Sequence, residues 1–157
     1  MSAAPPPSAS AQQKPQVNVF FHSLGKIFMR ILGWKIVGEF PNHPKIILAA
    51  YPHTTNWDGI FVILSSWVIR VRFSWLGKIQ LMRGPLGPPA KALGGIPIDR
   101  SASFNAVEQT VQYINKHERV ALAIAPEGTR RKTNYWRTGF YWIAYGAGIP
   151  IVCADQL

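Results

Sequence analysis

Apolar and polar positions follow a helical period in the first part of the chain. Within residues 17–34, large apolar side chains recur every three or four positions: Phe20, Leu24, Ile27, Phe28, Ile31 and Trp34. His22, Lys26 and Arg30 follow one another at four-residue steps on another face. This pattern predicts a basic amphipathic helix. Two interpretations stay open, because the pattern suits both a helix lying on anionic lipid and a helix packed on the core with its charges in water.

Two short apolar runs, residues 34–40 and 45–51, are joined by the proline-bounded segment 41–44 and are predicted to be strands. Residues 59–69 are apolar on every side, which favours a helix that is buried or partly faces lipid. This run is shorter than the roughly 20 residues that a helix needs to span a bilayer. We therefore predict no transmembrane segment in this sequence.

The second half of the chain alternates predicted helices with predicted strands. Residues 101–117 and 138–147 have helical patterns, and residues 119–125 and 148–154 read as strands. Such alternation is typical of an α/β domain, here a single domain with a mixed, mostly parallel sheet flanked by helices. We assign this domain to residues 17–157. Residues 1–16, rich in Ala, Pro and Ser, are predicted to form a disordered tail.

Composition adds a preference for lipid and for anions. Hydrophobic residues make up 48% of the 157 positions and charged residues only 15%, which indicates a membrane surface or a lipid groove. The formal net charge of +10 favours polyanionic partners such as anionic lipid, nucleic acid or phosphorylated ligands. A single cysteine, Cys153, excludes an internal disulfide and favours a reducing compartment. Because it lies on a predicted strand, we expect Cys153 to be a small, buried apolar filler rather than a nucleophile.

His53 and Asp58 are separated by four residues where the chain leaves a predicted strand. A histidine whose ring is oriented by a carboxylate can take a proton from a hydroxyl at neutral pH. If a helix begins near Thr55 or Asn56, Asp58 lies in its first turn, where the helix dipole favours the ionised form. A structural His–Asp pair is the alternative interpretation.

Two later segments carry candidate anion-binding groups. In residues 94–100, Gly95 permits close approach of a ligand to the backbone, and Arg100 can grip a phosphate with two hydrogen bonds. In residues 126–130, Gly128 exposes backbone amides beside Glu127, Thr129 and Arg130. Further cations follow at positions 131, 132 and 137. A glycine turn and a solvated run of charges are the alternative interpretations.

These segments together resemble the signature blocks of the glycerolipid acyltransferases related to 1-acyl-sn-glycerol-3-phosphate acyltransferase. Residues 53–58 match the family's histidine, four residues and aspartate. Residues 94–100 look like its second block, residues 126–130 match its third, and residues 148–152 are similar to its fourth. The blocks occur in the family's order and cover most of the chain from about Leu48 to Val152.

The resemblance implies a glycerolipid-acyltransferase-like fold and an O-acyltransferase that needs no metal or bound cofactor. The fatty acyl group would pass from acyl-CoA or acyl-carrier protein to the hydroxyl of a lysophospholipid such as 1-acylglycerol-3-phosphate, in phospholipid synthesis or remodelling. His53 would be the general base and Asp58 would orient it. The substrate-binding residues would be Gly95, Arg100, Glu127, Gly128, Thr129 and Arg130. We expect a peripheral protein on the cytoplasmic face of a membrane.

A second class of function remains, a non-catalytic basic protein that binds anionic membranes or nucleic acid. The cations favour it, but the sequence has no identifiable aromatic or groove-reading nucleic-acid motif, so no nucleic-acid partner is expected. The sequence ends at Leu157, directly after the fourth block, whereas domains of the family usually continue. A truncated product and a minimal member of the family would both end there.

Overall fold

A computed structural model of the protein describes residues 16–51, 57–99, 103–129 and 133–155. The strands in these residues form one sheet in the order β3-β2-β4-β1-β5. Their bounds are β1 (Lys45–Tyr51), β2 (Phe73–Lys78), β3 (Gly95–Ile98), β4 (Val120–Ile124) and β5 (Ile151–Asp155). All of their pairings are parallel. The predicted α/β class, one mostly parallel sheet flanked by helices, is confirmed.

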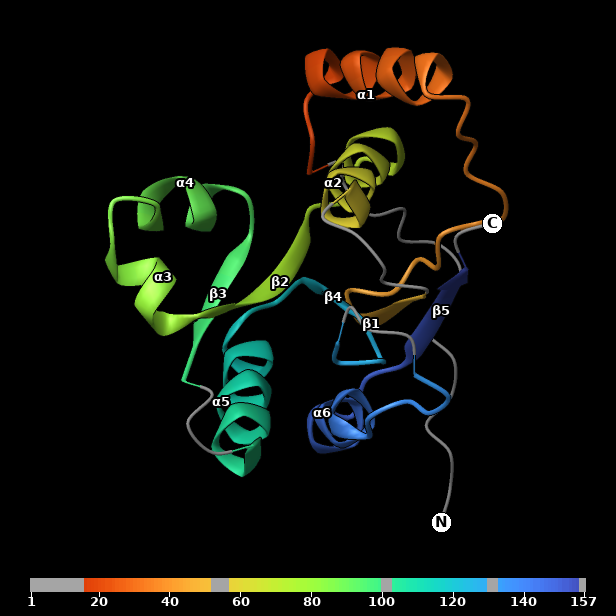
Figure 1. Ribbon diagram of the computed structural model, residues 1–157. Coiled ribbons are helices and arrows are strands. Elements are labelled where there is room, and N and C mark those ends of the chain that lie inside the picture. The colour runs from red at the N-terminus through yellow and green to blue at the C-terminus, as the bar shows by residue number, and fades with distance from the viewer. Residues whose placement is uncertain (1–15, 52–56, 100–102, 130–132, 156–157) are drawn as a thin grey trace.

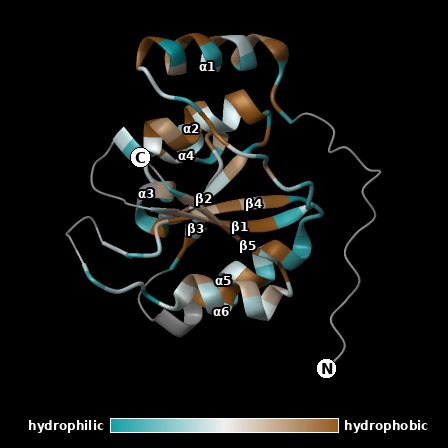
Figure 2. Cartoon of the chain, turned by 90° about the vertical axis from the view of Figure 1, so that its right-hand side faces the viewer, coloured by the Kyte–Doolittle hydropathy of each residue, from teal (hydrophilic) through white to brown (hydrophobic). Residues whose placement is uncertain are grey.

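Helices cover both faces of the sheet (Figure 1). On one face lie α2 (Trp57–Ile69), α3 (Ile79–Arg83) and α4 (Gly87–Ala92); on the other lie α5 (Ser103–Lys116) and α6 (Gly139–Ala147). α1 (Val19–Ile31) forms an outermost layer over α2, as Figure 2 shows. Among the described residues, no helix combines the length and the apolar character that crossing a membrane requires.

The core has one part on each side of the sheet. Ile47 and Leu122 point toward α5 and α6, where they pack with Ile114, Ile143 and other buried side chains. On the opposite face, Ile46, Leu48, Phe73 and Ala121 pack with residues that include Val62 and Ile69 of α2. The successive residues of β1 therefore alternate between two apolar layers, which explains why residues 45–51 read as a continuous apolar run.

α1 packs on α2 through a small contact face. Gly25 and Met29 are its buried residues, and a Cβ built on Gly25 would lie 2.9 Å from Cβ of Trp67. The half-buried His22 places its Nδ1 atom 3.2 Å from the carbonyl oxygen of Trp67. Only part of the predicted apolar stripe lies against α2: Trp34 is half-buried and stacks on Phe61 of that helix. Phe20, Ile27 and Ile31 are instead 68%, 55% and 73% exposed.

Two expectations from the sequence are wrong. Residues 34–40 form no strand, and Val37 is 92% exposed in this segment. Both edges of β1 are already occupied, by β4 and β5, so the run before it cannot pair with it. Cys153, expected to be a buried apolar filler, is exposed on β5, which is an edge strand.

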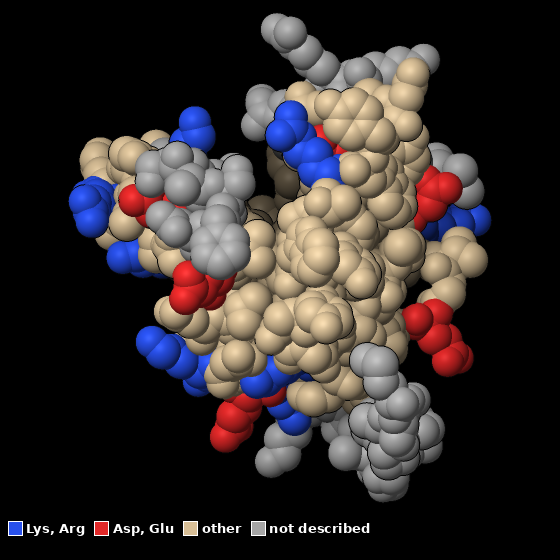
Figure 3. All heavy atoms as spheres, turned by 90° about the horizontal axis from the view of Figure 1, so that it is seen from below, with Lys and Arg blue, Asp and Glu red and all other residues tan. Residues whose placement is uncertain are grey.

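The two outer faces of the molecule differ in character. Seen from the side of α5 and α6, charged residues lie mainly around the rim of a largely uncharged face (Figure 3). Three aromatic residues of α6, Tyr141, Trp142 and Tyr145, are 48%, 52% and 70% exposed. The face that α1 presents instead mixes exposed apolar side chains with the exposed cations Lys26 and Arg30.

Candidate active site

The parallel sheet places the carboxyl ends of the strands that precede the candidate segments at one edge. Parallel strands have their carboxyl ends on the same side, and ligands of open α/β sheets bind outside these ends. Tyr51 ends β1 directly before the His53 segment, and Ile124 ends β4 directly before residues 126–130. β1 and β4 are neighbours, with Ala49 paired to Ile124. The carboxyl ends of β1 and β4, which are far apart in the sequence, therefore lie side by side at this edge.

Asp58 lies in the first turn of α2, as predicted, and its side chain is buried. A carboxylate in the first turn is stabilised by the amino-terminal end of the helix dipole. Along the same helix, Gly59, Val62, Ile63, Ser66 and Trp67 also line a groove, and this spacing of three and four residues defines one helical face. The end of α2 that carries Asp58 and the apolar face of the helix thus line the same groove.

Residues 125–129 form a tight turn after β4. The Gly128 amide donates to the carbonyl oxygen of Ala125 at 3.1 Å, and Gly128 has a left-handed φ of 63°. A Cβ at this position would lie 2.5 Å from Cδ of Arg137. The Arg137 amide donates to the carbonyl oxygen of Pro126 at 2.8 Å, which fixes the returning chain against the turn. The Arg137 side chain therefore lies against Gly128, the residue that follows the buried Glu127.

Three predicted site residues, His53, Arg100 and Arg130, lie outside the described residues. Gly95 is described at the start of β3, whereas the Asp99–Arg100 segment follows its other end. A Cβ on Gly95 would lie 2.5 Å from Cε of Met82 and 2.7 Å from the carbonyl oxygen of Ala90. Close packing therefore accounts for a glycine at this position. Asp58, Glu127 and Thr129 each have an interaction partner.

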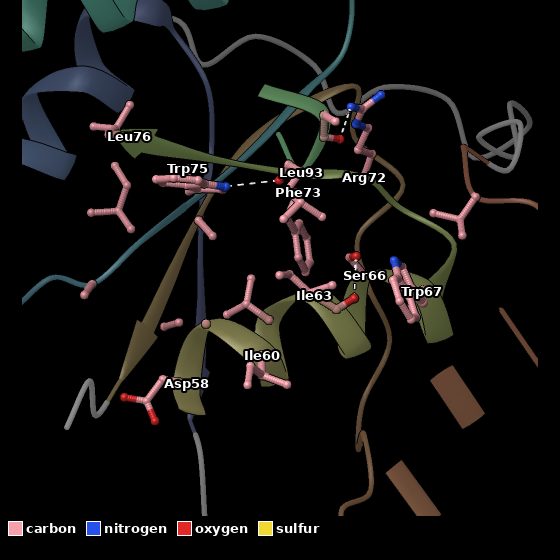
Figure 4. Close-up of a pocket in the computed structure, with 18 of the residues that line it drawn as sticks. Asp58, Ile60, Ile63, Ser66, Trp67, Arg72, Phe73, Trp75, Leu76 and Leu93 are labelled. Atoms are coloured by element: carbon pink, nitrogen blue, oxygen red, sulfur yellow. Dashed lines mark hydrogen bonds between the residues drawn. The ribbon is translucent and has the colours of Figure 1, made fainter. Parts of the chain in front are cut away.

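A large groove of about 1050 Å³ leads away from this edge. Asp58, Gly128 and Thr129 line one end of it. From there it runs between α2 and β2, over apolar side chains such as Ile63, Phe73 and Leu76 (Figure 4). Its volume is at the upper end of the range usual for ligand pockets. The groove is long, and most of its lining between Asp58 at one end and Gln16 and Arg72 at the other is apolar. Such a groove suits a molecule with a polar reacting group and a hydrocarbon chain.

The far end of the groove is held by hydrogen bonds between segments distant in sequence. Trp75 donates from Nε1 to the carbonyl oxygen of Leu93 at 3.0 Å, and Arg72 donates from its guanidinium to that of Ala92. The Arg72 amide donates to Oε1 of Gln16 at 2.9 Å. These bonds join β2, α4 and the chain entering α1 around the end of the groove, where Figure 4 shows Arg72 and Trp67.

Sequence reasoning did not assign a site role to Arg137 or Lys78. Arg137 was part of a basic run, but only the turn at Gly128 shows that its side chain lies beside the predicted acceptor segment. Lys78 ends β2 and pairs with Ile98, so it reaches the same edge as the segment containing Arg100. The local sequence gives no signal for either position, because Lys78 is placed by the pairing of β2 with β3 and Arg137 by the turn at Gly128.

The fold and this edge define an α/β protein in which the buried Asp58, in the first turn of α2, lines a largely apolar groove. Residues 35–154 match the model of the Acyltransferase family, and the chain belongs to that family. No curated protein sequence matches the chain.

The fold is similar to the crystal structure of the 1-acyl-sn-glycerophosphate (LPA) acyltransferase PlsC from Thermotoga maritima, with a TM-score of 0.57 and 19% identity. The similarity covers 84% of this chain and 54% of that one. The chain thus spans about half the length of the PlsC chain.

Proposed function

We propose that this protein transfers a fatty acyl group from an acyl thioester to the hydroxyl of a lysophospholipid such as 1-acylglycerol-3-phosphate. Membership in the Acyltransferase family supports the reaction class. The observation that carries the proposal is the continuity between Asp58 and the apolar groove. A thioester placed at this junction would have its carbonyl carbon near the His53–Asp58 segment and its hydrocarbon chain along α2.

In the proposed mechanism, His53 acts as general base and Asp58 orients its ring. The acceptor oxygen attacks the thioester carbonyl carbon while its proton passes to the imidazole. When the tetrahedral intermediate collapses, the C–S bond breaks and the leaving thiolate takes the proton from the imidazolium. The oxygen ester and the free thiol are the products, and no covalent acyl-enzyme forms. Acyl-CoA and acyl-carrier protein are both acidic donors suited to the positive charge of the chain.

The acceptor phosphate is proposed to bind at the Glu127–Gly128–Thr129 turn, with Arg100 and Arg130 as its cations. We also predict that Gly95 takes part in substrate binding. The side chain of Arg137 lies against Gly128 and would add a further guanidinium to the proposed phosphate site. Guanidinium groups bind phosphate through paired, charge-assisted hydrogen bonds. A phosphate held here would bring the acceptor hydroxyl toward the end of β1.

We further propose that the protein works as a peripheral protein on the cytoplasmic face of a membrane. The exposed apolar side chains of α1, among them Phe20, Ile27 and Ile31, favour the lipid-facing interpretation of this helix. Lys26 and Arg30 are exposed beside them, and the anionic cytoplasmic leaflet attracts such cations. An enzyme at this surface would meet its lysophospholipid acceptor in the membrane.

The decisive test compares wild-type protein with His53→Ala, using labelled acyl-CoA, acyl-carrier protein and a panel of lysolipids. Removing a positioned general base should lower kcat by about 10² to 10⁴. His117→Ala is the control, because His117 is exposed at the end of α5 and its ring stacks on Tyr113. Near-full activity of the His53 variant would refute the mechanism. Vesicle binding without turnover of any thioester would favour the non-catalytic alternative.

A further inference from the structure

A second, smaller cleft of about 390 Å³ lies beside the carboxyl end of α1. It is formed by α1, the segment that follows it and one residue of α2: Lys26, Met29, Arg30, Gly33, Trp34, Lys35, Ile36 and Val68. It shares no lining residue with the groove that begins at Asp58. The cleft is therefore a feature separate from the proposed catalytic site.

The cleft is shaped by the way in which α1 ends. Gly33 has a φ of 74°, its amide donates to the carbonyl oxygen of Arg30 at 3.2 Å, and the Trp34 amide donates to that of Met29 at 2.9 Å. This pair of hydrogen bonds is the Schellman arrangement that closes a helix and reverses the chain. The reversal brings Lys35 to the same cleft as Lys26 and Arg30.

The charge in the cleft has a single sign. Lys26, Arg30 and Lys35 are all exposed, and among the described residues no carboxylate lines the cleft. Three cations around a small concavity favour an anion bearing several oxygen atoms, such as a phosphate group. They also repel one another, so a bound anion would relieve this repulsion.

The apolar part of the cleft distinguishes a lipid from a free phosphate. Met29 is buried at the base, and Trp34 stacks on Phe61 of α2 with ring centroids 4.1 Å apart. Ile36, which also lines the cleft, and its neighbour Val37 are 42% and 92% exposed. Inorganic phosphate would gain nothing from these apolar groups. A phospholipid would place its phosphate among the cations and its glycerol and upper chains over the apolar side chains.

We propose that this cleft is a headgroup site for an anionic phospholipid of the membrane, distinct from the site that binds the lysophospholipid acceptor. The proposal rests on the proposed peripheral association through α1 and adds to it a preference for anionic headgroups. The site would hold the helix at the depth where Phe20, Ile27 and Ile31 meet the hydrocarbon. Lipid composition would thereby regulate how much of the protein is at the surface.

The test measures binding of the full chain to vesicles of phosphatidylcholine alone and of phosphatidylcholine with phosphatidylglycerol. Lys26→Glu/Arg30→Glu should lower the affinity for anionic vesicles at least about tenfold, since each cation near the surface contributes about 1 kcal/mol. Its binding to neutral vesicles should stay unchanged. The control Lys91→Glu/Lys116→Glu makes the same change in charge at exposed positions of α4 and α5. An equal loss in this control would overturn the proposal.

Two further measurements separate this proposal from the proposed function. Ile27→Ser/Ile31→Ser should weaken binding to both kinds of vesicle, because it removes the apolar contact. Unchanged binding of this variant would contradict peripheral association through α1. The Lys26/Arg30 variant should also keep full turnover of a water-soluble, short-chain acceptor, which needs no membrane. Loss of that turnover with a circular dichroism spectrum like that of the wild type would place the cations in catalysis and overturn the headgroup site.

Discussion

Arg137 and Gly128 form a contact on which the proposed phosphate site depends. Position 128 requires a left-handed backbone, and a Cβ there would collide with the Arg137 side chain. The hydrogen bond from the Arg137 amide to Pro126 holds the two segments together from the backbone. A glycine nine positions earlier in the chain thus leaves the space that the Arg137 side chain occupies. Arg137 should therefore act in acceptor binding rather than in the transfer step.

We expect Arg137→Ala to raise KM for a phosphate-bearing acceptor about tenfold and to change kcat little. Hydrogen bonds to charged groups contribute about 1.5–3 kcal/mol, which is enough for an effect of this size. Arg137→Lys should restore only part of the affinity, because an ammonium cannot bind phosphate as a planar fork. Initial rates with lysophosphatidic acid and with uncharged monoacylglycerol measure the effect. Arg83→Ala, exposed on α3, is the control.

An equal rise in KM for monoacylglycerol would show that Arg137 supports the site without binding phosphate.

The sequence could predict the position of Asp58, because a carboxylate in the first turn follows from local helix signals. It could not predict the position of Arg137, because that side chain is placed by a turn between distant segments. The sequence thus predicts where a residue lies within its own helix, but not which residues from other parts of the chain it contacts.

At the scale of elements, the contact between α1 and α2 depends on Gly25. The nearest atoms to a Cβ at this position are Cβ of Trp67 at 2.9 Å and the carbonyl oxygen of Leu64 at 3.3 Å. Neither atom is the end of a flexible side chain, so relief requires the helices to separate. The absence of a side chain at Gly25 therefore sets how closely α1 approaches α2.

Gly25→Ala should destabilise the protein by about 1–3 kcal/mol, although alanine is the better helix former, because overpacking opposes its propensity. Urea unfolding monitored by circular dichroism measures the change. Gly139→Ala is the matched control, since a Cβ at Gly139 would have no neighbour within 4 Å and its φ is not left-handed. This control should be neutral or slightly stabilising. A Gly25 variant as stable as the control would mean that the two helices are not closely packed.

Among the helices, the sequence predicted the longer ones and missed the short ones. α1, α2, α5 and α6 have patterns that extend over several turns or apolar runs bounded by glycine, and all were expected close to their observed positions. α3 and α4 have only five and six residues, too few for a period to show. The orientation of α1 was not predictable. His22, Gly25 and Met29 face α2 because close approach selected small or adaptable residues there, and most of the apolar stripe was left outside.

At the scale of the whole molecule, the groove joins parts of the chain that no local pattern connects. Its lining comes from the chain before α1, from α1 and α2, and from strands β1, β2 and β4. α2 is apolar all around because it has three neighbours: the groove, the sheet and α1. The sequence predicted this uniform apolar character as burial or partial contact with lipid. That α2 has three different neighbours could be learned only from the structure.

Filling the groove should change which acyl chains are accepted. Ser66 lines it and donates from Oγ to the carbonyl oxygen of Ile63 at 2.6 Å. Ser66→Phe should shift the ratio of kcat/KM for octanoyl over palmitoyl donors upward, about tenfold, because the longer chain loses its apolar contacts. Ile63→Phe, a smaller increase in volume in the same groove, should shift it in the same direction.

Ser65→Phe is the control, since Ser65 neighbours Ser66 on α2 but is not among the residues that line the groove. Thermal unfolding shows whether each variant is folded. Folded groove variants with an unchanged donor preference would contradict the proposal that the acyl chain lies along α2. The result does not depend on the identity of the acceptor.

The strand order also has a consequence for synthesis. β1 is synthesised early, but its partners in the sheet are β4 and β5. Lys45 pairs with Val120 and Ile47 with Ile151, so neither pair can form until the later strand has been made. While the ribosome makes the intervening segments, both edges of an apolar strand stay unpaired, and such edges template aggregation. Pairing across long sequence separations is also slow. The nascent chain should therefore depend on holding chaperones until β5 emerges.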